Sequence, residues 1–210
     1  MYTFYRAARF ILAPVFRAIF RPRIIGSKNI PQSGAAVIAG NHKHALDPIL
    51  IDVSTRRVVR TLAKKELHDS AFGFLFRSAG TIPVDLHAKH NPAALEAAVE
   101  ALGRGELVNV SPEAKRNYTD ELLLPFKFGA AVMSERTGAV IVPYAIAGDY
   151  SLFPRHRLTV IFGKPMEYGE TPEITNRRLY NEVARLLRKA MPAEELRGKH
   201  FTSYESWEEK

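Results

Sequence analysis

The chain has 210 residues, a formal net charge of +8 and no cysteine. Its length fits one globular domain, and the lack of cysteine excludes disulfides, thiolate metal sites and a cysteine nucleophile. The excess positive charge indicates an anionic partner, which nucleic acid, a phospholipid surface or a phosphorylated substrate would each satisfy.

Residues 1–28 hold six cationic residues and no acidic one. In a helical projection the arginines and the apolar residues gather on opposite sides. The arginines are Arg6, Arg9, Arg17 and Arg21, and the apolar set is Phe4, Ala8, Ile11, Val15 and Ile19. This pattern predicts an amphipathic helix in the headgroup plane of anionic lipid, kinked or split at Pro14. A first helix that simply packs on the core is the alternative.

Residues 29–191 alternate between apolar runs and helical patterns. Residues 35–39 predict a buried strand, and Asp47 before Pro48 predicts a helix start with aspartate as its cap. Further strands are predicted at 58–63, 81–85, 107–110, 139–148 and 157–163, and helices at 70–80, 92–102, 127–137 and 174–190. The order indicates a single α/β domain with a largely parallel central sheet flanked by helices. Residues 192–210 are expected to form a loosely held polar tail.

Two polar loops follow predicted strands: NHKHALDP at 41–48 and SPEAKRN at 111–117. Ligands of open α/β sheets gather at the carboxyl ends of the strands. Across the first loop His42 and Asp47 can meet, and a carboxylate that fixes one imidazole nitrogen leaves the other free to take a proton. His42 is therefore predicted to be a general base for a substrate hydroxyl. The alternative makes Asp47 a mere cap and His42 an ordinary loop residue.

The second loop places Lys115 and Arg116 after Glu113. A guanidinium recognises phosphate through paired charge-assisted hydrogen bonds, so this loop predicts a phosphate site, with a solvated surface pair as the alternative. His42 and His44 form an H-x-H pair, but the H-x-H-x-D-H order of binuclear zinc hydrolases is missing, and we expect no metal.

Four blocks in order resemble the 1-acyl-sn-glycerol-3-phosphate acyltransferases, also called lysophosphatidic acid acyltransferases. NHKHALD resembles the H-x4-D box of that family, and AKKEL with GTIPVD resembles its second block. SPEAKRN resembles the F-P-E-G-T-R-S block, and VPYAI resembles V-P-V-x-I. The similarity covers roughly residues 24–165.

The resemblance implies that His42 is the base and that Asp47 orients it. The implied binding residues for the glycerol phosphate are Glu113, Arg116 and Lys115, with Lys64 or Lys65. The implied reaction moves an acyl group from acyl-CoA or acyl carrier protein to lysophosphatidic acid or another lysolipid, in phospholipid biosynthesis, without a resident cofactor. The expected location is the cytoplasmic side of the cell membrane, with peripheral or monotopic attachment to membrane phospholipids.

This chain departs from the family pattern at Ser111, Ala114 and Lys115, which replace phenylalanine, glycine and threonine. If the loop needs a positive φ at position 114, alanine costs on the order of 1 kcal/mol. The departures leave the acceptor open between lysophosphatidic acid, another lysophospholipid and a different lipid hydroxyl or amine. Two alternatives from other classes are a membrane-associated lipid-binding homologue without activity and a nucleic-acid-binding module. We expect no nucleic acid, because no basic strand interleaved with aromatic residues occurs.

Overall fold

The computed structural model describes residues 3–71, 73–85, 88 and 91–208. Its strands are β1 (Arg23–Ile25), β2 (Ala36–Gly40), β3 (Val59–Lys64), β4 (Ile82–Val84), β5 (Leu107–Val110), β6 (Val140–Ala147) and β7 (Thr159–Phe162). They form one sheet in the order β1-β7-β6-β2-β5-β3-β4. Among these strands the pairings are parallel except for β6 with β7, which is antiparallel. The predicted largely parallel sheet is confirmed.

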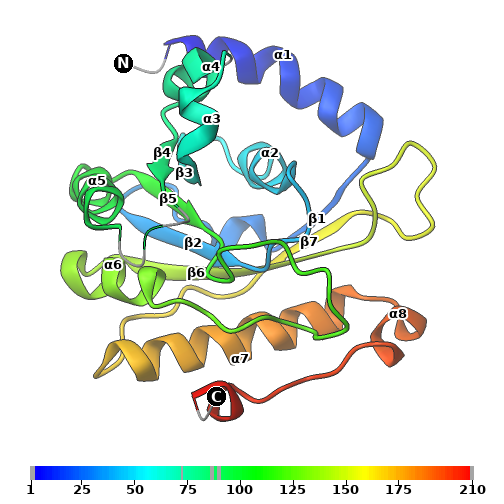
Figure 1. The fold of residues 1–210 in the computed structure, drawn as a ribbon. Coiled ribbons are helices and arrows are strands. Elements are labelled where there is room, and N and C mark those ends of the chain that lie inside the picture. The colour runs from blue at the N-terminus through cyan, green and yellow to red at the C-terminus, as the bar shows by residue number, and fades with distance from the viewer. Residues whose placement is uncertain (1–2, 72, 86–87, 89–90, 209–210) are drawn as a thin grey trace.

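The helices cover both faces of the sheet (Figure 1). They are α1 (Thr3–Phe20), α2 (Asp47–Val53), α3 (Lys65–Asp69), α4 (Gly73–Ser78), α5 (Pro92–Gly103), α6 (Gly129–Thr137), α7 (Pro172–Ala190), α8 (Ala193–Arg197) and α9 (Tyr204–Glu208), with a 3-10 turn η1 at Ser27–Asn29. Helices α1 and α2 lie on one side of the sheet, and α6 and α7 lie on the other. Each side has its own apolar core.

Strand β2 supplies both cores because successive side chains of a strand point to opposite faces. Val37 and Ala39 pack on the α7 side, while Ala36 and Ile38 pack on the α2 side. A strand buried on both faces has an uninterrupted apolar sequence, which is why residues 35–39 predicted it. The loop that leaves β2 therefore starts in the middle of the sheet.

Helix α1 runs through Pro14 as one helix, so the alternative of two short helices is wrong. Its arginine side faces the domain: Arg9 and Arg17 donate to the backbone carbonyls of Arg57 and Val53, and Phe16 is buried. The opposite apolar side is exposed, at Ile11, Val15 and Ile19. The predicted division of the helix into two sides is present, and the packed side is the one with the arginines. The side chain of Phe4 lies outside the part that the structure describes.

The prediction of a loosely held tail is wrong. Residues after Met191 form α8 and α9, and Tyr204 is buried in the core on the α7 side. The backbone at His200 exchanges hydrogen bonds with Asp120 and Leu122, at 2.7 and 2.6 Å. Because the segment is mostly polar, its composition did not indicate that Tyr204 anchors it in the core. Strand β1 and helix α3 were likewise not predicted, because three to five residues carry too little periodicity.

Candidate active site

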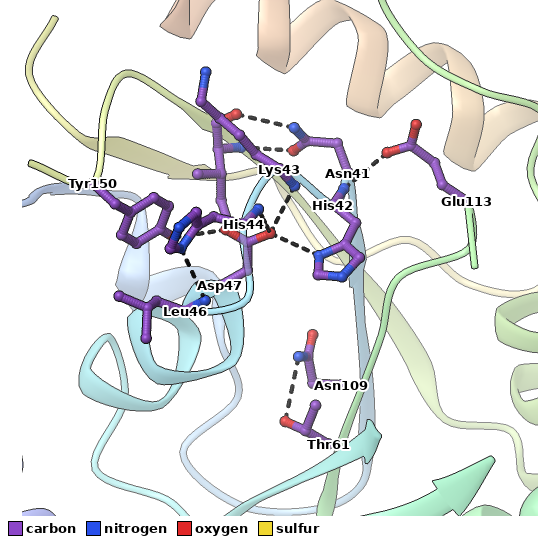
Figure 2. Close-up of polar contacts among 11 residues, drawn as sticks. Asn41, His42, Lys43, His44, Leu46, Asp47, Thr61, Asn109, Glu113 and Tyr150 are labelled. Atoms are coloured by element: carbon purple, nitrogen blue, oxygen red, sulfur yellow. Dashed lines mark hydrogen bonds and ion pairs between the residues drawn. The ribbon is translucent and has the colours of Figure 1, made fainter. Parts of the chain in front are cut away.

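The site is assembled at the carboxyl ends of adjacent strands. The loop with His42 leaves β2, the loop with Glu113 leaves the neighbouring β5, and β3 on the far side of β5 ends at Lys64. Parallel strands end at the same edge, so residues distant in sequence are brought together there. Asn41 holds the start of the first loop, because its side-chain amide exchanges hydrogen bonds of 2.8 and 3.0 Å with the backbone of Ile146 (Figure 2).

His42 and Asp47 contact each other as predicted. The Nδ1 atom of His42 lies 2.8 Å from Oδ2 of Asp47, and that oxygen also accepts from the backbone amides of Lys43 and His44, at 2.7 and 2.8 Å. Asp47 is 1% exposed, whereas the side chain of His42 is 24% exposed. Asp47 was predicted to be the N-cap of α2, but the N-cap is Leu46 and Asp47 is the first helical residue. Its carboxylate accepts from the loop amides, so it organises the loop.

This geometry determines which imidazole nitrogen is free. A carboxylate only accepts hydrogen bonds, so the Nδ1 proton of His42 points at Asp47. The lone pair of Nε2 is then available to a substrate proton, from a side chain that solvent reaches. The pair has the arrangement of a general base and the acid that orients it.

Glu113 is a buried organiser of the second loop. It is 4% exposed, and its two oxygens accept from the backbone amides of His42 and Leu124, both at 2.8 Å. Burial raises the pKa of the Glu113 carboxyl from 4.5 to about 7, although the two amide donors act in the opposite direction. Sequence resemblance implied that Glu113 holds the glycerol phosphate. The contacts that the structure describes for its carboxylate tie the two loops together.

A second bond joins the loops, since the backbone amide of Asn117 donates to the carbonyl of His42 at 3.2 Å. Between these two ties the chain turns at Ala114, which has a φ of +57°. The left-handed conformation considered from the sequence is therefore present. An L-residue there carries strain of about 1 kcal/mol that glycine does not.

The predicted cations surround this edge without entering the small cavity beside His42. That cavity measures about 60 Å³ and is lined by Lys43, Glu113 and Asn117 among others. Lys115 and Arg116 are exposed, and the Arg116 guanidinium lies 5.5 Å from the centre of the Tyr118 ring. Of the two lysines from the other block, Lys64 ends β3 and is exposed, and Lys65 pairs with Asp69 at 2.8 Å.

A family model described as Acyltransferase matches residues 21–147, which is more than half of the sequence and includes both loops. The chain belongs to the acyltransferase family. The resemblance inferred from the four blocks is thereby confirmed.

Named relatives of this acyltransferase point the same way. It is 27% identical over 162 residues to a 1-acyl-sn-glycerol-3-phosphate acyltransferase of Helicobacter pylori, covering 75% of this chain and 68% of the relative. It is 29% identical over 132 residues to the protein of that name from Borreliella burgdorferi, covering 62% of this chain and 52% of the relative. The chain thus spans about half the length of the second relative.

The fold of this acyltransferase is similar to the crystal structure of the 1-acyl-sn-glycerophosphate (LPA) acyltransferase PlsC from Thermotoga maritima. The TM-score is 0.68 at 22% identity, over 87% of this chain and 81% of the other. At that identity the likeness concerns the fold. It agrees with the mostly parallel sheet described above.

Two residues of the site were missed from the sequence. Asn41 holds the loop to β6, and the Tyr150 hydroxyl donates to Oδ1 of Asp47 at 2.7 Å (Figure 2). Tyr150 lies three residues beyond the end of β6 and three beyond the family match. Because β6 runs parallel to β2, its carboxyl end lies at the same edge. The rule that ligands gather at the carboxyl ends of the strands would therefore have indicated Tyr150. Within the described residues, no group of three or more histidine, aspartate or glutamate side chains could hold a metal ion.

Proposed function

We propose that this acyltransferase moves a fatty acyl group from an acyl thioester, acyl-CoA or acyl carrier protein, to the free hydroxyl of a lysophospholipid. The principal acceptor in the proposal is 1-acyl-sn-glycerol-3-phosphate, and the product is phosphatidic acid. The family and the printed names of its relatives support this class of reaction. No resident cofactor takes part.

The observation that carries the proposal is the 2.8 Å contact between His42 and Asp47. In the proposed step Nε2 of His42 takes the acceptor's hydroxyl proton as the oxygen attacks the thioester carbonyl carbon. The tetrahedral intermediate then expels the thiolate, which takes the proton back from His42. Asp47 stabilises the transient imidazolium. General base catalysis of this kind contributes about 10²- to 10⁴-fold.

The acceptor phosphate is assigned to the cations of the same edge. Arg116 and Lys115 lie on the loop tied to His42, and Lys64 ends a strand one place further along the sheet. Among the described ion pairs these three cations have no carboxylate partner. An exposed cation without an acidic neighbour retains its attraction for phosphate. Lys65 contributes less in this proposal, because Asp69 already neutralises it.

The proposal places the enzyme on the cytoplasmic side of the cell membrane, attached by α1. The exposed apolar side of that helix suits the acyl region of a bilayer. A cleft of about 1120 Å³ lies on the inner side of α1. The cationic residues that line it are Arg6, Arg9, Arg17, Lys28, Arg56 and Arg57. No acidic side chain of the described chain lines this cleft, although Asp52 lies nearby and accepts from Tyr5. Across the described residues, none of the helices has the length and apolar character to cross a bilayer.

Thiol release with a panel of acceptors tests the reaction. The purified protein is offered acyl-CoA or acyl carrier protein thioesters with lysophosphatidic acid, other lysophospholipids and lipid amines. We expect release with at least one lysophospholipid and the largest kcat/KM with lysophosphatidic acid. His42→Ala and Asp47→Asn are each expected to lower kcat by about 10²- to 10⁴-fold.

His200→Ala is the matched control, because this histidine is exposed and its described hydrogen bonds come from the backbone. It should retain wild-type activity. Full activity in folded His42→Ala protein would refute the mechanism. Absence of turnover with every acceptor would instead favour a lipid-binding homologue without activity.

A further inference from the structure

The two carboxylate oxygens of Asp47 are held from different parts of the chain. Oδ2 faces His42 and the amides of its own loop, whereas Oδ1 accepts from the hydroxyl of Tyr150. Tyr150 is 103 positions away along the chain. Figure 2 shows the phenol reaching Asp47 from the side opposite to the His42 ring. Both oxygens of the carboxylate that orients the base are thus held by hydrogen bonds.

The Tyr150 hydroxyl remains protonated and can therefore donate a hydrogen bond to Asp47. Burial, and then the nearby charge of Asp47, raise the pKa of the Tyr150 phenol far above its usual range, so its proton stays in place. The 2.7 Å bond to an ionised oxygen belongs to the strong charge-assisted class. With Oδ1 held in this way, rotation of the carboxylate out of the plane of the His42 ring requires breaking that bond.

The Tyr150 ring is in turn placed by groups outside its own loop. It stacks on the His44 ring with centroids 4.6 Å apart and planes 20° apart. It also makes T-shaped contacts with two rings of α1, with centroid distances of 5.8 Å to Phe20 and 6.5 Å to Phe16. The β6–β7 connection, drawn in yellow in Figure 1, reaches the C-terminal end of α1. Tyr150 therefore lies between the catalytic loop and the N-terminal helix.

Helix α1 is seated on the domain by buried aromatic side chains and polar bonds: Tyr5 and Phe16 are buried, and the Tyr5 hydroxyl donates to Asp52. Its contacts also include the arginine bonds to the last residue of α2 and to the α2–β3 connection, and the aromatic rings against Tyr150, while its outer side is exposed. A shift of α1 would displace Phe20 and Phe16, whose rings contact the Tyr150 ring. The position of the hydroxyl then depends on how α1 is seated.

We propose that Tyr150 is a positioning residue of the acyl transfer, holding Asp47 against His42, and that helix α1 controls this hold through Phe20. The inference rests on the proposed function, because it assigns a rate effect to the same pair. Tyr150 acts through Asp47 and has no contact with the reacting atoms in this scheme. Seating α1 on a lipid surface, with its apolar side buried, would then favour the active arrangement of the site.

Tyr150→Phe tests the hydroxyl while keeping the ring. With acyl-CoA and lysophosphatidic acid we expect kcat to fall about 10- to 100-fold, with KM for both substrates within about twofold, because binding groups are untouched. Tyr168→Phe is the matched control, since its hydroxyl also donates to a carboxylate, that of Glu135 at 2.8 Å, on the exposed surface. It should leave kcat unchanged. A Tyr150→Phe enzyme with wild-type kcat would overturn the proposal.

An NMR measurement separates positioning from simple loss of packing, and it does not depend on turnover. In ¹⁵N-histidine-labelled protein the Nδ1 proton of His42 should give a downfield signal that moves or exchanges faster in Tyr150→Phe. A signal identical in both proteins would overturn the positioning role even if activity fell. If the wild type acylates no lysolipid, the proposed function fails, and the positioning of Asp47 is then decided by this signal alone.

A double-mutant cycle tests the link to α1. Phe20→Leu keeps an apolar side chain and removes the ring that contacts Tyr150, so we expect kcat to fall several-fold. In the Tyr150→Phe background the same change should have almost no further effect, because the hydroxyl that Phe20 positions is gone. Independent, multiplicative losses would show that α1 and Asp47 are not coupled through Tyr150.

Discussion

Glu113 gives the acyltransferase a dependence of stability on pH that can be calculated. The carboxyl has a pKa of about 7 when folded and an ordinary value of 4.5, so the folded state binds its proton more tightly. The resulting stabilisation is fully present below about pH 4.5 and is lost as the pH rises through about 7. The difference of 2.5 units, at 1.36 kcal/mol per unit, corresponds to about 3 kcal/mol.

Replacing Glu113 with glutamine removes this titration. We expect the free energy of unfolding of the wild type, relative to Glu113→Gln, to fall by about 3 kcal/mol between pH 4.5 and pH 7.5. Glutamine also leaves one of the two backbone donors unpaired, which costs about 1 to 3 kcal/mol at every pH and does not change the slope. Urea unfolding at several pH values measures both quantities.

Glu170→Gln is the matched control, because this glutamate is exposed. Its stability should follow the wild type across the same pH range. A constant difference between wild type and Glu113→Gln would refute the reasoning, because it would mean that burial does not raise the proton affinity of Glu113. A difference that grows with pH would contradict the sign.

Three further predictions concern strain, packing and charge. Ala114→Gly should stabilise the protein by about 0.5 to 1 kcal/mol, seen by calorimetry as a rise in Tm of roughly 1 to 4 °C, because it relieves the positive φ. Gly40→Ala should cost about 3 kcal/mol or more in urea unfolding, because its Cβ would lie 2.2 Å from a carbonyl oxygen of β6, whereas Gly103→Ala meets nothing and should be tolerated. Lys28→Gln and Arg56→Gln should each weaken sedimentation with anionic vesicles about fivefold and leave weak binding to neutral vesicles unchanged. Equal loss on both vesicle types would contradict the electrostatic explanation.

The local sequence was sufficient to predict the helices and strands that are long enough to show a pattern. Asn91 and Pro92 start α5, and Gly138, with a φ of 67°, ends α6 where glycine was expected to stop it. These signals work because a cap or a stop depends on the conformation of one residue. Strand β1 depends instead on pairing with β7, more than 130 residues away, and nothing local marks it.

The contact between His42 and Asp47 was predictable because the two residues are five positions apart in one loop. The structural role of Glu113 was not predictable. Its two partners are the backbone amides of His42 and Leu124, which lie 71 and 11 positions away in the sequence. A family motif indicates that an acid belongs at this position. It does not indicate whether the carboxylate turns outward to a substrate or inward to the backbone.

The order of apolar runs and turn residues along the chain was enough to specify an α/β domain, a loop bearing His42 and Asp47, and a helix with an arginine side and an apolar side. Assembly of the sheet settled the rest: which side of α1 packs, the inward turn of Glu113, and the approach of Tyr150 to Asp47. The physical reason is range. Hydrophobic periodicity and backbone capping act over a few residues, whereas hydrogen bonds between loops exist only after parallel strands have brought their carboxyl ends to one edge.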